Sequence, residues 1–248
     1  MNSEKKGKFD MVSGVIDQSQ QNAAKIAGFT LIFAIAIVVI SNYSVTFRYI
    51  VADAAETAEN IITYKTAFRF NIFCNLIYLV TLILMSTSLY VILKPVNKNF
   101  AMAAVFARFV YALIWAIMAI NTFNAFRLLG NAAYLPAFDA GQLQALSKLH
   151  LTSSWDAYYV GLPFWGLASM ICSFLLFRSK YIPKVLAVFG IISSAWCVFC
   201  AFTYLIFPEY GETVHIGLFD VPMIIFEITL GFWLLIKGLK VQPNPVNQ

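Results

Sequence analysis

Charged residues are scarce in this 248-residue chain. Asp, Glu, Lys and Arg together make up 12% of it, whereas an average soluble domain contains about 25%. Hydrophobic residues supply 60%, and the mean hydropathy is +0.76. A soluble globular domain of this size needs a more polar surface, so the composition excludes that class.

Histidine is scarcer still, with only His150 and His215 in the whole chain. Intramembrane zinc hydrolases need several His and Asp residues at helical spacing, and neither His-x-x-x-His nor His-Glu-x-x-His occurs. Gly-x-Ser-x-Gly, Gly-x-Gly-x-x-Gly and the phosphate-binding loop are also missing. We therefore predict no metal, no cofactor and no catalytic residue, and an enzyme is the less favoured class.

The four cysteines, at 74, 172, 197 and 200, all lie in apolar stretches. None falls in a predicted outer loop, which argues against an exterior stabilised by disulfides. Cys197 and Cys200 form a Cys-x-x-Cys pair, the chemistry that a thiol or quinone oxidoreductase would use if one thiolate were reachable. The alternative, which we favour, is that both cysteines pack as small apolar side chains.

Long apolar stretches dominate the sequence. Each is close to the ~20 residues that carry a helix across the hydrocarbon core. Solid apolar runs also differ from the alternating strands of an outer-membrane barrel. The predicted fold class is therefore all-α, a polytopic membrane protein with six transmembrane helices. The stretches cover residues 24–43, 70–93, 100–126, 158–177, 185–207 and 218–236.

The basic residues collect at the ends of these stretches and predict the topology. If the N-terminus is cytoplasmic, eleven Lys and Arg lie inside and five outside, and this bias sets orientation. We predict that both termini face the cytoplasm, in the plasma membrane. The net charge of +5 then reflects topology, and no nucleic acid partner is expected. The inner residues are Lys5, Lys6, Lys8, Lys25, Lys94, Lys98, Arg178, Lys180, Lys184, Lys237 and Lys240; the outer ones are Arg48, Lys65, Arg69, Arg127 and Lys148.

The chain divides into a polar N-terminal segment (1–22), a transmembrane domain (23–240) and a short tail (241–248). Apolar positions around residues 9–16 fit either a short interfacial helix or a mobile tail. The first outer loop, 52–66, is rich in Ala and Glu and is predicted to be partly helical. In the second, Asp139 followed by Gln142 is typical of a helix start and predicts a short amphipathic helix.

Four segments carry a resemblance to a known family. They are residues 89–98 (LYVILKPVNK), 107–108 (AR), 142–146 (QLQAL) and 176–183 (LFRSKYIP). Together they resemble the bacterial membrane family called domain of unknown function 4386, over residues 23–240. The resemblance implies a multi-pass membrane fold, and it implies no activity or catalytic residues.

Two charges fall inside the apolar stretches, where charge is costly. Arg108 lies in the third stretch and Glu227 in the sixth. At a rise of 1.5 Å per residue, both are roughly 13–15 Å from the cytoplasmic face. Equal depth and opposite charge predict that they pair. The pair either orients two helices or forms part of a ligand or proton site.

A second polar layer is predicted near the outer face. Asp220 and Asp156 open the sixth and fourth stretches, Asn75 lies in the second, and Tyr159 shares a helix face with Asp156. With Arg69 and Arg127 at the outer ends of the second and third stretches, these residues would border an outward-facing, water-filled vestibule. The alternative is ordinary hydrogen bonding between helices, worth ~1 kcal/mol per contact.

Aromatic and glycine residues are read as packing features. The five tryptophans, Trp165 among them, are expected to be interface anchors and packing residues. Gly161, Gly166 and Gly190 are expected to permit close helix approach.

Three functions remain open at this point. The first is binding or transport of a small molecule through the outward-facing cavity, with Arg108, Glu227, Asp220, Asp156, Asn75 and Tyr159 as ligand-binding residues. The second is a non-enzymatic membrane partner or regulatory subunit with a structural polar core. The third is the Cys197/Cys200 oxidoreductase. The expected partners are the bilayer and a small-molecule or lipid ligand, and the chain could also oligomerise.

Overall fold

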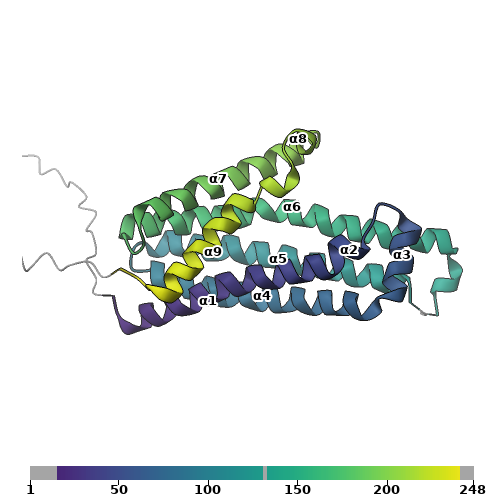
Figure 1. The fold of residues 1–248 in the computed structure, drawn as a ribbon, viewed down its shortest axis with the longest axis horizontal. Coiled ribbons are helices and arrows are strands. Elements are labelled where there is room, and N and C mark those ends of the chain that lie inside the picture. The colour runs from purple at the N-terminus through teal and green to yellow at the C-terminus, as the bar shows by residue number, and fades with distance from the viewer. Residues whose placement is uncertain (1–15, 131–132, 241–248) are drawn as a thin grey trace, which may run out of the picture.

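A computed structural model describes residues 16–130 and 133–240, and within these ranges the chain is helical, without strands. The long helices lie side by side in one elongated bundle (Figure 1). They are α1 (Gln18–Ser41), α4 (Lys65–Leu93), α5 (Lys98–Leu128), α6 (Ala140–Ser179), α7 (Lys184–Ile206) and α9 (Val221–Ile236).

Short elements connect these helices. Of the predicted loop helices, the one in 52–66 is confirmed as α3, where the Asp53 carboxylate accepts a hydrogen bond from the backbone N–H of Glu56 at 2.8 Å. The possible helix around 9–16 falls almost entirely outside the described residues. The connecting elements are a π-helical turn (Asn42–Thr46), α2 (Phe47–Tyr49), α3 (Ala54–Thr63), α8 (Tyr210–Thr213), and 3-10 turns at Leu135–Ala137 and Ile216–Leu218.

Five helical segments within the described residues are long and apolar enough to cross a membrane, which makes this a polytopic membrane protein. The sixth apolar helix, α9, has only 16 residues. It is shorter than the predicted 218–236 because it begins at Val221, after a 3-10 turn. Pro222 lies in its first turn, where a missing N–H is tolerated.

Helix α6 departs most from the prediction. The capping box is confirmed: Asp139 accepts from the Gln142 N–H at 2.8 Å, and Gln142 accepts from the Asp139 N–H at 3.2 Å. The expected short outer helix is wrong, however, because this helix runs unbroken to Ser179 over 40 residues. No glycine or proline between residues 142 and 160 ends it. Its first half extends past α7 and α9 and packs beside α3 (Figure 1).

The two ends of the bundle differ in their contents. At one end, here called the termini end, lie the start of α1, the end of α9, and the α4–α5 and α6–α7 turns (Figure 1). The Gln21 side chain bonds both the N–H and the C=O of Leu239 there, and the Lys240 N–H donates to the Tyr181 carbonyl. At the opposite or far end, α3 covers a separate small apolar cluster that includes Ile61, Phe68 and Leu151.

Small residues bring the helices close, as predicted for three glycines. A Cβ added at Gly166 would come within 2.6 Å of Val198, one at Gly190 within 2.4 Å of Phe226, and one at Gly161 within 3.1 Å of Tyr111. Gly28 on α1 faces Gly231 on α9 in the tightest backbone contact of this kind. Large apolar side chains on the outside of the bundle, such as Phe106 at 63% exposure, suit a lipid environment.

Candidate functional site

A buried ion pair lies near the middle of the bundle, at the junction of α5, α6 and α9. Arg108 on α5 and Glu227 on α9 are 3.3 Å apart between Nη2 and Oε1. The two residues are only 2% and 4% exposed. The predicted pairing is confirmed, because the chain brings the opposite charges to the same depth.

Glu227 is held by more than the arginine. Its Oε1 accepts hydrogen bonds from the Ser169 hydroxyl at 2.6 Å and from the Trp165 indole N–H at 3.0 Å. Both residues are on α6, four positions apart, so they face α9 from one side of the helix. Arg108 donates to the same Ser169 hydroxyl at 3.0 Å. These bonds link three helices through one carboxylate oxygen.

Packing fixes the orientation of the Trp165 indole. Tyr111, one turn after Arg108, stacks on Trp165 with ring centroids 5.9 Å apart and planes 11° apart. The Tyr111 ring lies against Gly161, where a Cβ would come within 3.1 Å of it. Gly161 therefore makes room for Tyr111, which in turn aligns the indole with Glu227.

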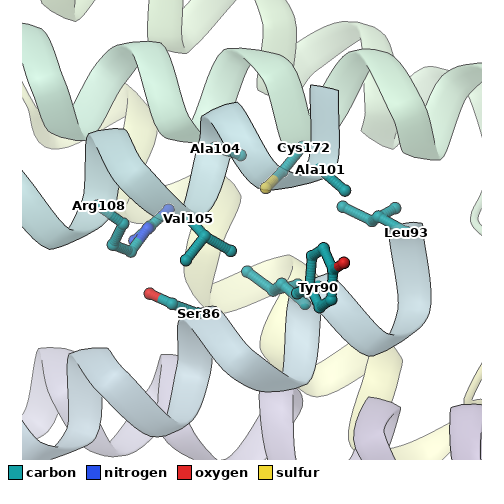
Figure 2. A pocket seen from close by; sticks show the side chains of 9 residues that line it. Ser86, Tyr90, Leu93, Ala101, Ala104, Val105, Arg108 and Cys172 are labelled. Carbon is teal, nitrogen blue, oxygen red and sulfur yellow. The ribbon is translucent and has the colours of Figure 1, made fainter. Parts of the chain in front are cut away.

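A small pocket adjoins the pair on the side of the termini end. It lies between α4 and α5, and Arg108 is one of its lining residues (Figure 2). The volume open to the centre of a water molecule is about 10 Å³, which is the size that admits one water. Its lining residues are Ser86, Leu89, Tyr90, Leu93, Ala101, Ala104, Val105, Arg108 and Cys172.

Asp220, predicted as an outer ligand residue, has a different partner from those expected. It is partly buried and accepts a hydrogen bond from the Tyr158 hydroxyl. Tyr159 is buried and packs on Tyr204 of α7, with ring centroids 4.7 Å apart. Asp156 is exposed on the surface of α6. Asp156 is exposed whereas Tyr159 is buried, so these two residues do not share one environment.

Asn75 belongs to another contact altogether. Its amide donates to Asn71 at 3.1 Å, and the Asn71 amide donates to the Ser41 hydroxyl at 2.8 Å. Ser41 ends α1 and precedes the π-helical turn. Asn75 thus supports the α1–α4 packing, the alternative that the sequence left open for the polar layer.

The predicted vestibule does not bring its four charges together. Arg69 lies over the ring of Phe126, 5.4 Å from its centroid, and lines a pocket against α3 at the far end. Asp220 begins α9, whose 16 residues span roughly 24 Å, whereas Arg69 is roughly 36 Å along α4 from the termini end. The α4 and α5 helices extend farther from the termini end than α9 does, so Arg69 and Arg127 lie closer to the far end than Asp220.

The four cysteines are free and buried. The Cys200 sulfur is 3.7 Å from the Tyr210 hydroxyl, a weak contact that leaves Cys197 and Cys200 unbonded to each other. Within the described ranges, no three His, Cys, Asp or Glu side chains gather in a way that could hold a metal ion.

Replacing both Cys197 and Cys200 with Ala is expected to leave the protein folded, since each change removes one buried sulfur. A loss of about 1 kcal/mol per site is typical of removing one buried atom. Thermal unfolding of the purified variant in detergent measures it. A variant that folds like the natural protein yet loses a ligand response would contradict the packing role.

Sequence reasoning missed Ser169 and Trp165 as members of the site. Trp165 was expected to be an anchor or packing residue, but its buried indole also donates to the central carboxylate. The available signal was spacing: Trp165 and Ser169 are one turn apart in the fourth apolar stretch, at a depth similar to Arg108 and Glu227. A serine or tryptophan in a membrane helix is common, so that spacing alone does not single them out.

Comparison with known proteins places this bundle in a family. An uncharacterized protein of the archaeon Archaeoglobus fulgidus is 29% identical over 160 residues, which cover 63% of this chain and 76% of that protein. No solved structure matches the chain. A family model matches residues 26–238, nearly all of the helical bundle. The chain therefore belongs to the family described as Domain of unknown function (DUF4386).

Proposed function

We propose that this protein binds or transports a small molecule at the Arg108–Glu227 centre. The observation that carries the proposal is the combination of a buried ion pair with an adjoining water-sized pocket that Arg108 helps to line. Charged groups inside membrane proteins are expensive and typically mark ligand or ion pathways. Here both charges lie at mid-depth on different helices, as a transported or bound solute would require.

The proposal includes six membrane crossings with both termini in the cytoplasm. All six long helices are antiparallel to their neighbours in sequence, and the Lys- and Arg-rich turns collect at the termini end. That charge excess favours the cytoplasmic side. The plasma membrane is the proposed location.

The topology predicts that a cysteine at Asn97, in the α4–α5 turn, is shielded in intact cells. In a cysteine-free background, Asn97→Cys should react with a membrane-impermeant thiol reagent only after the cells are opened. A cysteine at Glu56 in α3 is the matched control and should react in intact cells. Strong labelling of Asn97→Cys in intact cells would show that the orientation is opposite to the predicted one.

A second function is supported by the completeness of the cluster. Glu227 accepts from three residues, and the pair is almost wholly enclosed. Such a cluster suits a membrane partner or regulatory subunit whose polar core only specifies the fold. Buried polar groups serve this purpose in some proteins.

Ligand binding separates the two candidates. Thermal unfolding of the full-length protein would be followed with a panel of organic acids, amines, amino acids and sugars. We expect one class of compound to raise the unfolding temperature of the natural protein. The same class should not raise the unfolding temperature of Glu227→Gln, a change that keeps the shape of the side chain. If no class has an effect on the natural protein, the structural role is the better account.

A further inference from the structure

Two adjoining clefts lie at the far end of the bundle, where α3 meets the start of α4, the end of α5 and the start of α6. The volume open to the centre of a water molecule is about 160 Å³ in the smaller cleft and about 500 Å³ in the larger. The larger alone falls within the ~300–1,000 Å³ that is typical of ligand pockets. Ile62 and Leu129 line both clefts, so the two form one continuous site.

The two clefts carry opposite charges. The smaller contains Lys65 and Arg69, one turn apart on α4, here called the α4 cations. The larger contains Glu56 and Glu59, one turn apart on α3, here called the α3 glutamates. All four residues are exposed, so a ligand reaches them from outside the bundle. Within residues 16–130 and 133–240, no ion pair joins the two sets, which leaves both charges open to a ligand.

The α4 cations lie at the level of lipid head groups. Arg69 and Lys94 bound the apolar part of α4, and their separation along the helix is roughly 37 Å at 1.5 Å per residue. The hydrocarbon core of a bilayer is ~30 Å thick, and the head-group layers extend it to ~40–45 Å. A membrane centred on this part of α4 therefore has Arg69 in one head-group layer and Lys94 in the other.

An apolar surface continues from the α4 cations toward the middle of the membrane. Phe73 and Leu76 follow Arg69 by one and two turns on the same face of α4, and both are exposed. On α5, the Phe126 ring lies under the Arg69 guanidinium and forms part of the smaller cleft. A ligand with a charged head and an apolar tail fits this arrangement, because charge and apolar surface follow each other along one helix face.

We propose that the two clefts hold the head group of a phospholipid that carries both a phosphate and an ammonium group. The phosphate binds the α4 cations, since Arg and Lys are the side chains that hold phosphate oxygens. The ammonium group lies beside the α3 glutamates, and an acyl chain lies along Phe73 and Leu76. Phe126 is roughly 27 Å along α5 from Arg108, so this site is separate from the ion-pair centre.

The first test removes the α4 cations from the full-length protein, purified in detergent. The probes are dioleoyl phosphatidylethanolamine and dioleoyl phosphatidylglycerol, and native mass spectrometry measures how much of each lipid is bound. Lys65→Gln/Arg69→Gln should lower the affinity for both lipids about tenfold or more, because each basic residue near a phosphate contributes about 1 kcal/mol. The matched control, Arg48→Gln/Arg127→Gln, removes two exposed positive charges that line neither cleft and should keep the affinity.

The second test concerns the ammonium group, which phosphatidylglycerol lacks. The natural protein should prefer phosphatidylethanolamine by about threefold, a typical effect of an exposed charge pair. In Glu56→Gln/Glu59→Gln this preference should vanish while the phosphate contacts maintain binding. The changed residues are exposed, so the variants should fold, and thermal unfolding checks this. If a double variant does not fold, its two single changes take its place.

Three outcomes would overturn the assignment. Lipid binding that survives the loss of the α4 cations would place the lipid elsewhere. A preference for phosphatidylethanolamine that persists without the α3 glutamates, or that is missing from the natural protein, would show that they do not recognise the ammonium group. Soluble phosphoethanolamine that raises the unfolding temperature as much as an equal concentration of the lipid would identify a free phosphate ester as the ligand.

Discussion

Glu227→Leu is expected to lower the free energy of unfolding by about 3–5 kcal/mol, because it leaves the Arg108 charge buried without its carboxylate. Arg108→Leu should have a similar effect, since Glu227 would keep only the Ser169 and Trp165 bonds. The double change to Leu should be far milder than either single one. Replacing a whole buried ion pair with apolar side chains is often neutral or stabilising.

The measurement is a double-mutant cycle on purified protein, by thermal or denaturant unfolding in detergent. The exposed charges Arg127 and Glu212 provide the control cycle. The effects of substituting these two residues on the free energy of unfolding should be additive, and each should be smaller than about 0.5 kcal/mol. Additive losses for Arg108 and Glu227 would mean that the two side chains do not interact in solution.

The same double variant also informs on function. If it folds well and keeps every ligand response of the natural protein, the pair is structural. If it folds well and loses that response, the pair takes part in binding. Stability and binding are separate readouts, so the cycle distinguishes the two candidate functions.

The ion pair was predictable because residue type and position along the sequence are enough to identify it. A charge in an apolar stretch stands out, and its depth follows from counting residues at 1.5 Å each. Arg108 and Glu227 had matching depth and opposite sign, and a buried charge needs a partner. The partner's identity followed without knowledge of which faces of the helices meet.

The outer polar residues were not predictable in this way, because their roles depend on helix rotation and neighbours. Asn75 and Tyr159 were both expected to line one cavity. In the bundle, α4 turns Asn75 toward Asn71 and α1, whereas Tyr159 packs on Tyr204 of α7. Polar residues near helix ends can satisfy one another or face water, so sequence position alone does not separate these outcomes.

Helix length was misjudged where polarity changed without a break in the backbone. The segment between Asp139 and Asp156 is polar enough to be taken for a separate loop helix. It contains no helix-breaking residue, and α6 continues through it. The first half of α6 therefore packs against α3, and the two helices contribute to the small apolar cluster at the far end.

Gly28→Ala is expected to lower the free energy of unfolding by about 1–3 kcal/mol, although alanine is the better helix former. A Cβ at this position would lie 2.7 Å from the Gly231 carbonyl oxygen and 2.8 Å from the Leu235 backbone N. Backbone atoms cannot rotate away, so α1 and α9 would have to separate. At Gly190, by contrast, the blocking atoms belong to the Phe226 and Ser173 side chains, which can shift.

The matched control is Gly141→Ala, at the start of α6. Its nearest neighbour to an added Cβ is an Asp139 carboxylate oxygen at 3.4 Å, an ordinary contact. That change should be neutral or stabilising by up to about 1 kcal/mol, since only helix propensity is altered. Unfolding of the two variants in the same detergent gives the comparison. Because α9 carries Glu227, separation of α1 from α9 should also weaken any ligand response that depends on this residue. Equal stability of Gly28→Ala and Gly141→Ala would show that α1 and α9 do not meet at this glycine pair.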